Sequence, residues 1–201
     1  MTKAIIFDFG GVLIDWDPKY LYKKLFEREE EMHHFLQNIC TSDWNEEQDG
    51  GRPIEEATGL LVQQYPDHEE HIKAYYGRWE EMLGGAFQGT VDILKQLKDS
   101  GRYKIYGLTN WSAETFPIAQ ERFEFLNWFD GIVVSGEERN RKPFPDFYQL
   151  LLDRYEVKAN EALFIDDNLR NIHAAEKIGI ESIAFKSPDQ LRQELRKKNI
   201  L

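Results

Sequence analysis

The sequence predicts an α/β protein built on a parallel sheet, with a helical segment inserted near its N-terminus. Three observations support this fold class: short apolar runs that end in polar or small residues, helical patterns that alternate with them, and a long charged segment without a strand pattern. The chain has 201 residues, which suits one domain or one domain with a sizeable insertion.

The first strand is expected at residues 4–7, where the apolar run Ala-Ile-Ile-Phe stops at Asp8 and is followed by Gly10-Gly11. Such a run is typical of a buried strand that leads into a tight loop. The same pattern predicts four further strands, at residues 105–108, 131–134, 163–165 and 182–185.

Helical patterns predict helices at residues 91–100, 116–125, 145–155 and 170–178. Strands that alternate with helices favour a parallel sheet. In such sheets ligands bind beyond the carboxyl ends of the strands, so the polar residues that follow the predicted strands indicate a binding site.

The segment of residues 16–87 has a different pattern, with no convincing strand. Its charged and amphipathic stretches predict helices within residues 18–39, 54–64 and 68–83. We therefore expect a helical cap domain of residues 16–87, and a core domain of residues 1–15 and 88–201. An insertion at a loop that carries a site is typical of a lid.

Composition excludes several classes of protein. The 36 acidic residues outnumber the 25 basic ones, and the formal charge of -11 would repel a nucleic acid backbone. No apolar run approaches the roughly 20 residues of a membrane helix. A single cysteine, Cys40, and an N-terminus without a secretory pattern favour a reduced, cytoplasmic protein. No nucleic acid, membrane or protein partner is predicted.

Polar residues with useful chemistry follow the predicted strands. Asp8, Thr109-Asn110 and Lys142 each have an ordinary explanation as a turn residue, a helix cap or a solvated lysine. Asp166-Asp167 is harder to explain, because the fold would bring both acids close to Asp8. The repulsion between each close pair of carboxylates costs about 3 kcal/mol at ~5 Å and an effective dielectric near 20. Oxygen ligands without Cys or His nearby favour Mg²⁺ as the ion that relieves this repulsion. Lys142 and Thr109 would hold an anion opposite it.

The order of these motifs resembles the haloacid dehalogenase-like (HAD) hydrolase superfamily. The matching motifs are Asp8-Phe9-Gly10-Gly11-Val12-Leu13, then Thr109-Asn110, then Lys142-Pro143, then Asp166-Asp167, and they extend over essentially the whole chain. The resemblance implies a Rossmann-like sheet with helices on both faces and a small helical cap inserted after the first motif.

The resemblance also implies roles in phosphate chemistry. It makes Asp8 the nucleophile that forms an aspartyl-phosphate. Thr109 would donate its hydroxyl and Asn110 its backbone N–H to the phosphate, Gly11 would lie against the substrate, and Lys142 would neutralise the phosphate and Asp8.

The same resemblance implies a Mg²⁺ site. Asp8 and the backbone carbonyl of Gly10 would be ligands, together with Asp167. Asp166 would contribute directly or through a water, and Asn171 lies where many relatives carry a further acid.

One residue departs from the pattern of the family. Most of its phosphatases have an Asp two residues after the nucleophile, as general acid and base, where this chain has Gly10. That function contributes about 10²–10⁴-fold in rate. Either the cap supplies a carboxylate, with Asp15, Asp17 or Asp43 as candidates, or the substrate has a good leaving group, or hydrolysis has been lost.

The favoured hypothesis is a Mg²⁺-dependent phosphatase of a small phosphorylated metabolite, with a sugar 1-phosphate as a candidate. A 2-haloacid dehalogenase and a non-catalytic protein that binds a phosphorylated ligand are the alternatives.

The sequence suggests an uncertain or minor place near the site for three further residues. Trp111 follows Thr109-Asn110 and would border the substrate or belong to the core. Arg52 would reach the cleft or lie on the surface, and Arg141 is expected to be solvated.

Overall fold

The computed structural model describes residues 2–201 and contains a five-stranded sheet in the order β5-β4-β1-β6-β7. All neighbouring pairs are parallel, so the predicted α/β fold with a parallel sheet is confirmed. The strands are β1 (Ala4–Phe7), β4 (Lys104–Thr109), β5 (Gly131–Val134), β6 (Ala162–Asp166) and β7 (Glu181–Ala184).

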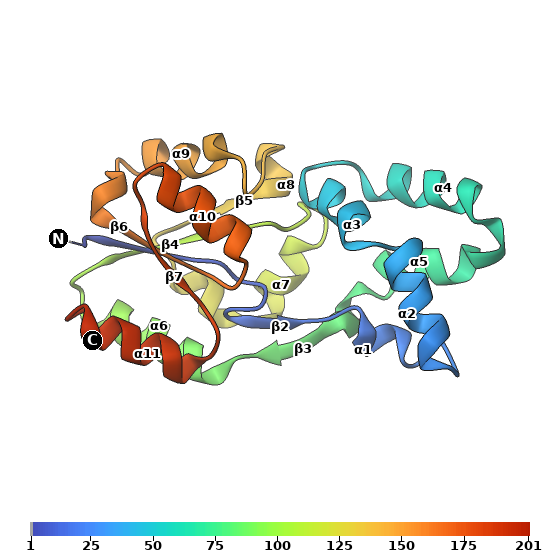
Figure 1. Ribbon diagram of the computed structural model, residues 1–201, viewed down its shortest axis with the longest axis horizontal. Helices are drawn as coiled ribbons and strands as arrows, with labels where there is room; N and C mark the ends of the chain where they lie inside the picture. Colours follow the sequence, from blue (N-terminus) through green and yellow to red (C-terminus); the bar gives the residue numbers. More distant parts are fainter. Residues whose placement is uncertain (1) are drawn as a thin grey trace.

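Helices cover both faces of this sheet, because successive side chains of each strand point to opposite sides. In β1, Ile5 and Phe7 pack with α6 (Gln88–Asp99), α7 (Phe116–Arg122) and α11 (Pro188–Lys197). On the other face, Ala4 and Ile6 pack with α9 (Pro145–Arg154) and α10 (Leu169–Lys177). Figure 1 shows these two helical layers above and below the sheet. Burial on both faces explains why β1 is a continuous apolar run.

Two C-terminal features differ from the prediction. The helix expected at residues 116–125 ends at Arg122 and is followed by a 3₁₀ turn, Glu124–Trp128. Helix α11 was not predicted from the sequence, although Ser187 caps it by accepting a hydrogen bond from the backbone N–H of Gln190.

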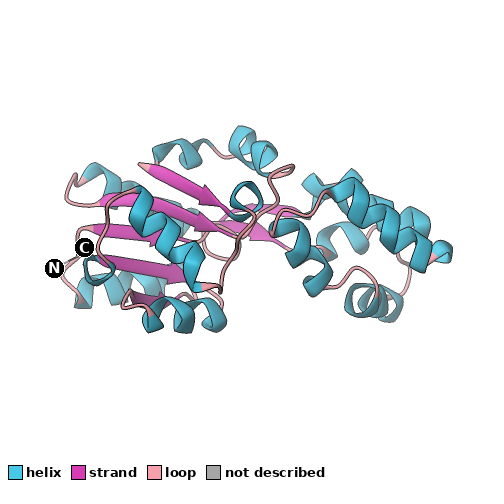
Figure 2. Ribbon diagram, turned by 90° about the horizontal axis from the view of Figure 1, so that it is seen from above, coloured by secondary structure: helices cyan, strands magenta, loops and turns pink. Residues whose placement is uncertain are grey.

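The segment between the first strand and α6 is mainly helical, as predicted, and lies beyond the carboxyl end of the sheet (Figures 1 and 2). Its helices are α1 (Lys19–Tyr22), α2 (Glu29–Asn38), α3 (Ser42–Asp49), α4 (Ile54–Gln64) and α5 (Glu69–Gly77). The stretch at residues 18–39 forms two helices rather than one. Helix α3 is an addition to the predicted elements, and Thr41 caps it by accepting from the backbone N–H of Trp44.

A two-stranded antiparallel ribbon joins this helical segment to the sheet. It consists of β2 (Ile14–Trp16) and β3 (Leu83–Ala86), so the expectation of no strand in residues 16–87 was wrong. Glycines make the ribbon possible: Gly85 has a φ of 133°, and a Cβ at Gly84 would lie 2.3 Å from Asp15 Oδ2. The division into a core and a cap of residues 16–87 stays a prediction.

The length and composition of the helices show whether any of them could cross a membrane. Across residues 2–201, none of them is both long and apolar enough to cross a bilayer.

Two leucines in helices test the assignment of the core. Leu94 in α6 is fully buried, whereas Leu60 in α4 is 53% exposed. We expect Leu94→Ala to lower the free energy of unfolding by about 2–5 kcal/mol, and Leu60→Ala to change it by less than about 0.5 kcal/mol. Chemical denaturation of both variants measures this, and equal losses would contradict the assignment.

Candidate active site

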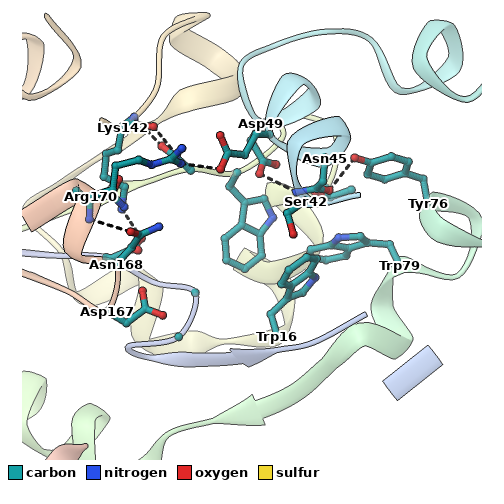
Figure 3. Close-up of a pocket in the computed structure, with 18 residues that line it drawn as sticks. Trp16, Ser42, Asn45, Asp49, Tyr76, Trp79, Lys142, Asp167, Asn168 and Arg170 are labelled. Carbon is teal, nitrogen blue, oxygen red and sulfur yellow. Dashed lines mark hydrogen bonds and ion pairs between the residues drawn. The ribbon is translucent and has the colours of Figure 1, made fainter. Parts of the chain in front are cut away.

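The carboxyl ends of β1, β4 and β6 open into a cavity of about 300 Å³. Residues of the ribbon and of α3 and α5 close its other side (Figure 3). The cavity is lined by Asp8, Gly10, Gly11, Trp16, Ser42, Asn45, Glu46, Asp49, Tyr76, Trp79, Asn110, Trp111, Thr115, Lys142, Asp167, Asn168, Arg170 and Asn171. Residues distant in the sequence therefore meet where the sheet topology predicts a site.

Lys142 lies between two carboxylates at the base of the cavity. Its Nζ is 2.8 Å from Asp8 Oδ1 and 2.7 Å from Asp166 Oδ2, and its side chain is fully buried. Burial opposes the charge on Lys142, but the attraction of Asp166 and Asp8 outweighs it and raises the pKa of the ammonium. Lys142 is thus held as a buried cation between two acids.

Asp8, Asp166 and Asp167 form a cluster in which one oxygen of each lies within 4.8 Å of the others. Burial raises the pKa of Asp8 well above its usual value, and Asp166 and Asp167 add to the rise while Lys142 opposes it. The pKa of Asp167 is also raised, by burial and by Asp166. One ammonium does not balance this charge, and a set of hard oxygen donors fits a divalent cation.

The two adjacent acids have different surroundings. Asp166 is fully buried and accepts hydrogen bonds from Lys142 Nζ, from the backbone N–H of Asn168 and from Asn171 Nδ2. Asp167 is exposed to the cavity instead. The geometry therefore favours Asp167 over Asp166 as the acid with a free oxygen.

Gly10 and Gly11, in the loop after β1, differ in whether the structure has room for a side chain. Gly11 has a φ of 73°, and a Cβ there would lie 2.3 Å from Asp167 Oδ2. A side chain at Gly11 would thus displace Asp167. Around Gly10, by contrast, no atom lies within 4 Å of an added Cβ. The absence of an acid at Gly10 is therefore not imposed by lack of space.

Thr109 and Asn110 supply the polar groups at the end of β4. Thr109 Oγ1 is buried and has no hydrogen-bond partner among the described residues. Asn110 exchanges two hydrogen bonds of 2.9 Å with the backbone of Lys142, which fixes the two loops together. A buried hydroxyl without a partner costs free energy, so it indicates a polar ligand.

The structure thus brings the predicted site residues together. Of these, Asp8, Gly10, Gly11, Asn110, Lys142 and Asp167 line the cavity directly. Thr109 and Asp166 are fully buried at the ends of β4 and β6. Their chemical roles stay predictions.

Four polar residues of α3 were missed by the sequence analysis. Ser42, Asn45, Glu46 and Asp49 line the cavity, and their spacing of three, four and seven residues places them on one helical face. That spacing was the available signal, but it required a helix at residues 42–49, which the sequence analysis did not predict.

The expectation that Arg141 is solvated was wrong. Its side chain is 17% exposed and forms ion pairs with Glu46, at 3.1 Å, and with Glu47, at 3.2 Å. Arg170 also pairs with Glu46, at 2.6 Å. These ion pairs connect α3 to the loop that contains Arg141 and to α10, on one side of the cavity.

The acids proposed to replace the missing one at Gly10 lie elsewhere. Asp15 accepts a hydrogen bond from the Tyr20 hydroxyl, Asp17 accepts one from the backbone N–H of Lys19, and Asp43 is exposed on α3. None of the three lines the cavity.

Aromatic side chains form the wall opposite the acids. Trp16, Tyr76, Trp79 and Trp111 line the cavity, and the rings of Trp79 and Trp111 meet edge to face at 5.5 Å. Trp111 is therefore both a cavity residue and a packing residue. Arg52 is not among the lining residues and instead donates hydrogen bonds to Gln48 Oε1 and the carbonyl of Trp44.

Known proteins resemble this chain along most of its length. A family model described as haloacid dehalogenase-like hydrolase matches residues 5–185. The sesquiterpene phosphatase astK of Aspergillus oryzae is 28% identical over 96% of this chain and 95% of its own length. The drimenol cyclase drtB of Aspergillus calidoustus is 26% identical over 97% of this chain, which spans only 36% of that protein.

Solved structures share the fold. A mutant HAD family enzyme from Bacteroides thetaiotaomicron, in complex with magnesium and inorganic phosphate, has a TM-score of 0.72 at 21% identity. The match covers 93% of this chain and 95% of that one.

Replacement of Lys142 tests the charge balance at the base of the cavity. We expect Lys142→Met to lower the free energy of unfolding by about 3–5 kcal/mol, because it leaves buried carboxylates without their cation. Lys95→Met is the matched control, since Lys95 is 59% exposed in its pair with Asp99 and contributes at most about 1 kcal/mol. Equal stability of the two variants in denaturant titrations would contradict this account.

Proposed function

The chain belongs to the haloacid dehalogenase-like hydrolase family, and from this membership we propose that it is a Mg²⁺-dependent phosphatase of a small phosphorylated metabolite. The observation that carries the proposal is the cluster of Asp8, Asp166 and Asp167 beside Lys142 and the free hydroxyl of Thr109. One side of this site suits a divalent cation and the other a phosphate. The phosphatase among the relatives and the neighbour with magnesium and phosphate support it.

The donor set fits Mg²⁺. Asp8, Asp167 and the backbone carbonyl of Gly10 would hold the ion, with Asp166 acting directly or through a water. Burial, and after it the neighbouring acids, raise the pKa values of Asp8 and Asp167, and buried carboxylates close to one another gain from a cation. When bound, Mg²⁺ would neutralise part of the charge on these acids and on the phosphate.

The protein groups then have defined tasks. A carboxylate oxygen of Asp8 attacks phosphorus, and the bond from phosphorus to the leaving oxygen breaks. The Thr109 hydroxyl and the Asn110 backbone N–H donate to the phosphoryl oxygens, and Lys142 offsets their charge. Water then attacks phosphorus. The bond from phosphorus to the Asp8 oxygen breaks, which releases phosphate and the free Asp8 carboxylate.

The aromatic wall supports an organic leaving group with an apolar face. Trp16, Tyr76, Trp79 and Trp111 would contact that group beyond the phosphate. The indole N–H groups of Trp16 and Trp111 are buried without partners in residues 2–201, so they would donate to substrate hydroxyls. A sugar 1-phosphate combines such a face, such hydroxyls and a good leaving group.

Replacement of the nucleophile tests this function. We expect Asp8→Asn to reduce phosphate release at least about a thousandfold, because an amide cannot form the aspartyl-phosphate. The assay covers sugar 1-phosphates, prenyl phosphates and acetyl phosphate in the presence of Mg²⁺. Asp92→Asn, at an exposed position of α6, should retain full activity. Unchanged turnover in Asp8→Asn would overturn the proposal.

Chelation separates a phosphatase from a dehalogenase, whose chemistry needs no metal. We expect phosphate release to disappear in excess chelator and to return when Mg²⁺ is added in excess. Ion chromatography should detect no halide from 2-haloacids under either condition. Halide release that persists in chelator would instead establish the dehalogenase, and tight phosphate binding without turnover would establish a binding protein.

A further inference from the structure

The loop after β1 leaves the leaving oxygen of a substrate without a proton donor, because Gly10 has no side chain. Any replacement must line the same cavity. The carboxylates that do so are Asp8, Glu46, Asp49 and Asp167. Asp8 and Asp167 belong to the cluster that suits a cation, which leaves the two acids of α3.

Glu46 and Asp49 differ in their charged partners. Glu46 forms ion pairs with both Arg141 and Arg170. Within residues 2–201, Asp49 has no lysine or arginine at ion-pair distance. Asp49 is therefore the acid of α3 that lines the cavity without an ion pair, and it is the candidate proton donor.

Asp49 lies over the loop that would bind the phosphate. Its backbone carbonyl accepts a hydrogen bond from Ser135 Oγ, and the same Oγ accepts one of 2.8 Å from the backbone N–H of Trp111. The backbone N–H of Ser112 also faces the Asp49 carboxyl group. Because Trp111 directly follows Asn110, these contacts place Asp49 beside the loop that would bind the phosphate.

A hydrogen-bonded chain fixes the direction of the carboxyl group. Asn45 Nδ2 donates to Asp49 Oδ2 at 2.9 Å, and the Tyr76 hydroxyl donates to Asn45 Oδ1 at 2.9 Å. All three side chains line the cavity, and Figure 3 shows them in a row along its upper edge. An acid that must transfer a proton needs this kind of orientation.

The surroundings of Asp49 favour its protonated form. Burial, followed by the charge of Glu46, raises its pKa to about 7, while the Ser112 N–H and Arg141 oppose the rise. Tyr75 and Tyr76 of α5 also face it, and their own pKa values are raised. A pKa near the working pH is the favourable value for general acid–base catalysis.

We propose that Asp49 is the catalytic acid and base that replaces the side chain missing at Gly10, a role that rests on the proposed phosphatase function. In the first step the protonated Asp49 gives its proton to the leaving oxygen as the bond from that oxygen to phosphorus breaks. In the second step the Asp49 carboxylate takes a proton from the attacking water. The bond from phosphorus to Asp8 then breaks, and Asp49 is protonated again.

A pair of aryl phosphates measures the need for an acid. We expect Asp49→Asn to lower kcat/KM for phenyl phosphate about 10²–10⁴-fold. The loss for p-nitrophenyl phosphate should be at least about tenfold smaller, because its better leaving group needs less protonation. Asp43→Asn, on the same helix but exposed, should change neither value. Retained turnover of p-nitrophenyl phosphate shows that the variant is folded.

The pH profile gives a second readout. A general acid must be protonated in the free enzyme, so kcat/KM for phenyl phosphate should fall as the pH rises above about 7. This alkaline limb should be absent in Asp49→Asn. Gly10→Asp should restore at least part of the lost activity in the Asp49→Asn variant, since space for a side chain is open at Gly10.

The outcomes separate the two proposals. Equal losses with both aryl phosphates, or an unchanged alkaline limb in Asp49→Asn, would overturn the role of Asp49 while leaving the phosphatase intact. Absence of phosphate release from the unmodified protein would overturn the phosphatase and the role of Asp49 with it.

Discussion

The placement of the Lys142 ammonium between Asp8 and Asp166 is the interaction on which the rest of the site depends. Three charges buried together are tolerable only because the ammonium reaches both carboxylates and amides satisfy the oxygens of Asp166. Asp166 is thereby committed to holding Lys142. Asp167, one residue further, remains directed at the cavity, so one of two adjacent acids serves internal packing while the other is free for the ligand-binding role that we propose.

The sheet and its site were predictable because their signals are local. β1, β4 and β6 are buried on both faces. A polar residue ends β4 and β6 and directly follows β1, so strand and site residue appear together in the sequence. The missed elements lack such signals. Helix α3 is almost entirely polar and buries only Gln48, and β3 is a short strand that contains two glycines. Their structure comes from contacts with distant parts of the chain.

Protonation was beyond the reach of sequence for the same reason. Glu46 and Asp49 are acids on one helix, three residues apart, and the sequence gives no reason to distinguish them. In the folded chain, Arg141 and Arg170 form ion pairs with Glu46, and neither forms one with Asp49. Asp15 and Asp17, two of the acids considered from the sequence, instead accept local hydrogen bonds. The sequence shows which residues are acids, but not which charged side chains surround Glu46 and Asp49 in the folded chain.

The β2–β3 ribbon has a consequence for how such a protein diversifies. Both connections to the helical segment run through it side by side, with Asp15 opposite Gly85. The chain thus enters and leaves the helical segment at nearly the same point. Helices there can be lengthened, replaced or lost during evolution without new strand pairing in the sheet, so substrate preference can change while the phosphate-handling machinery is inherited intact.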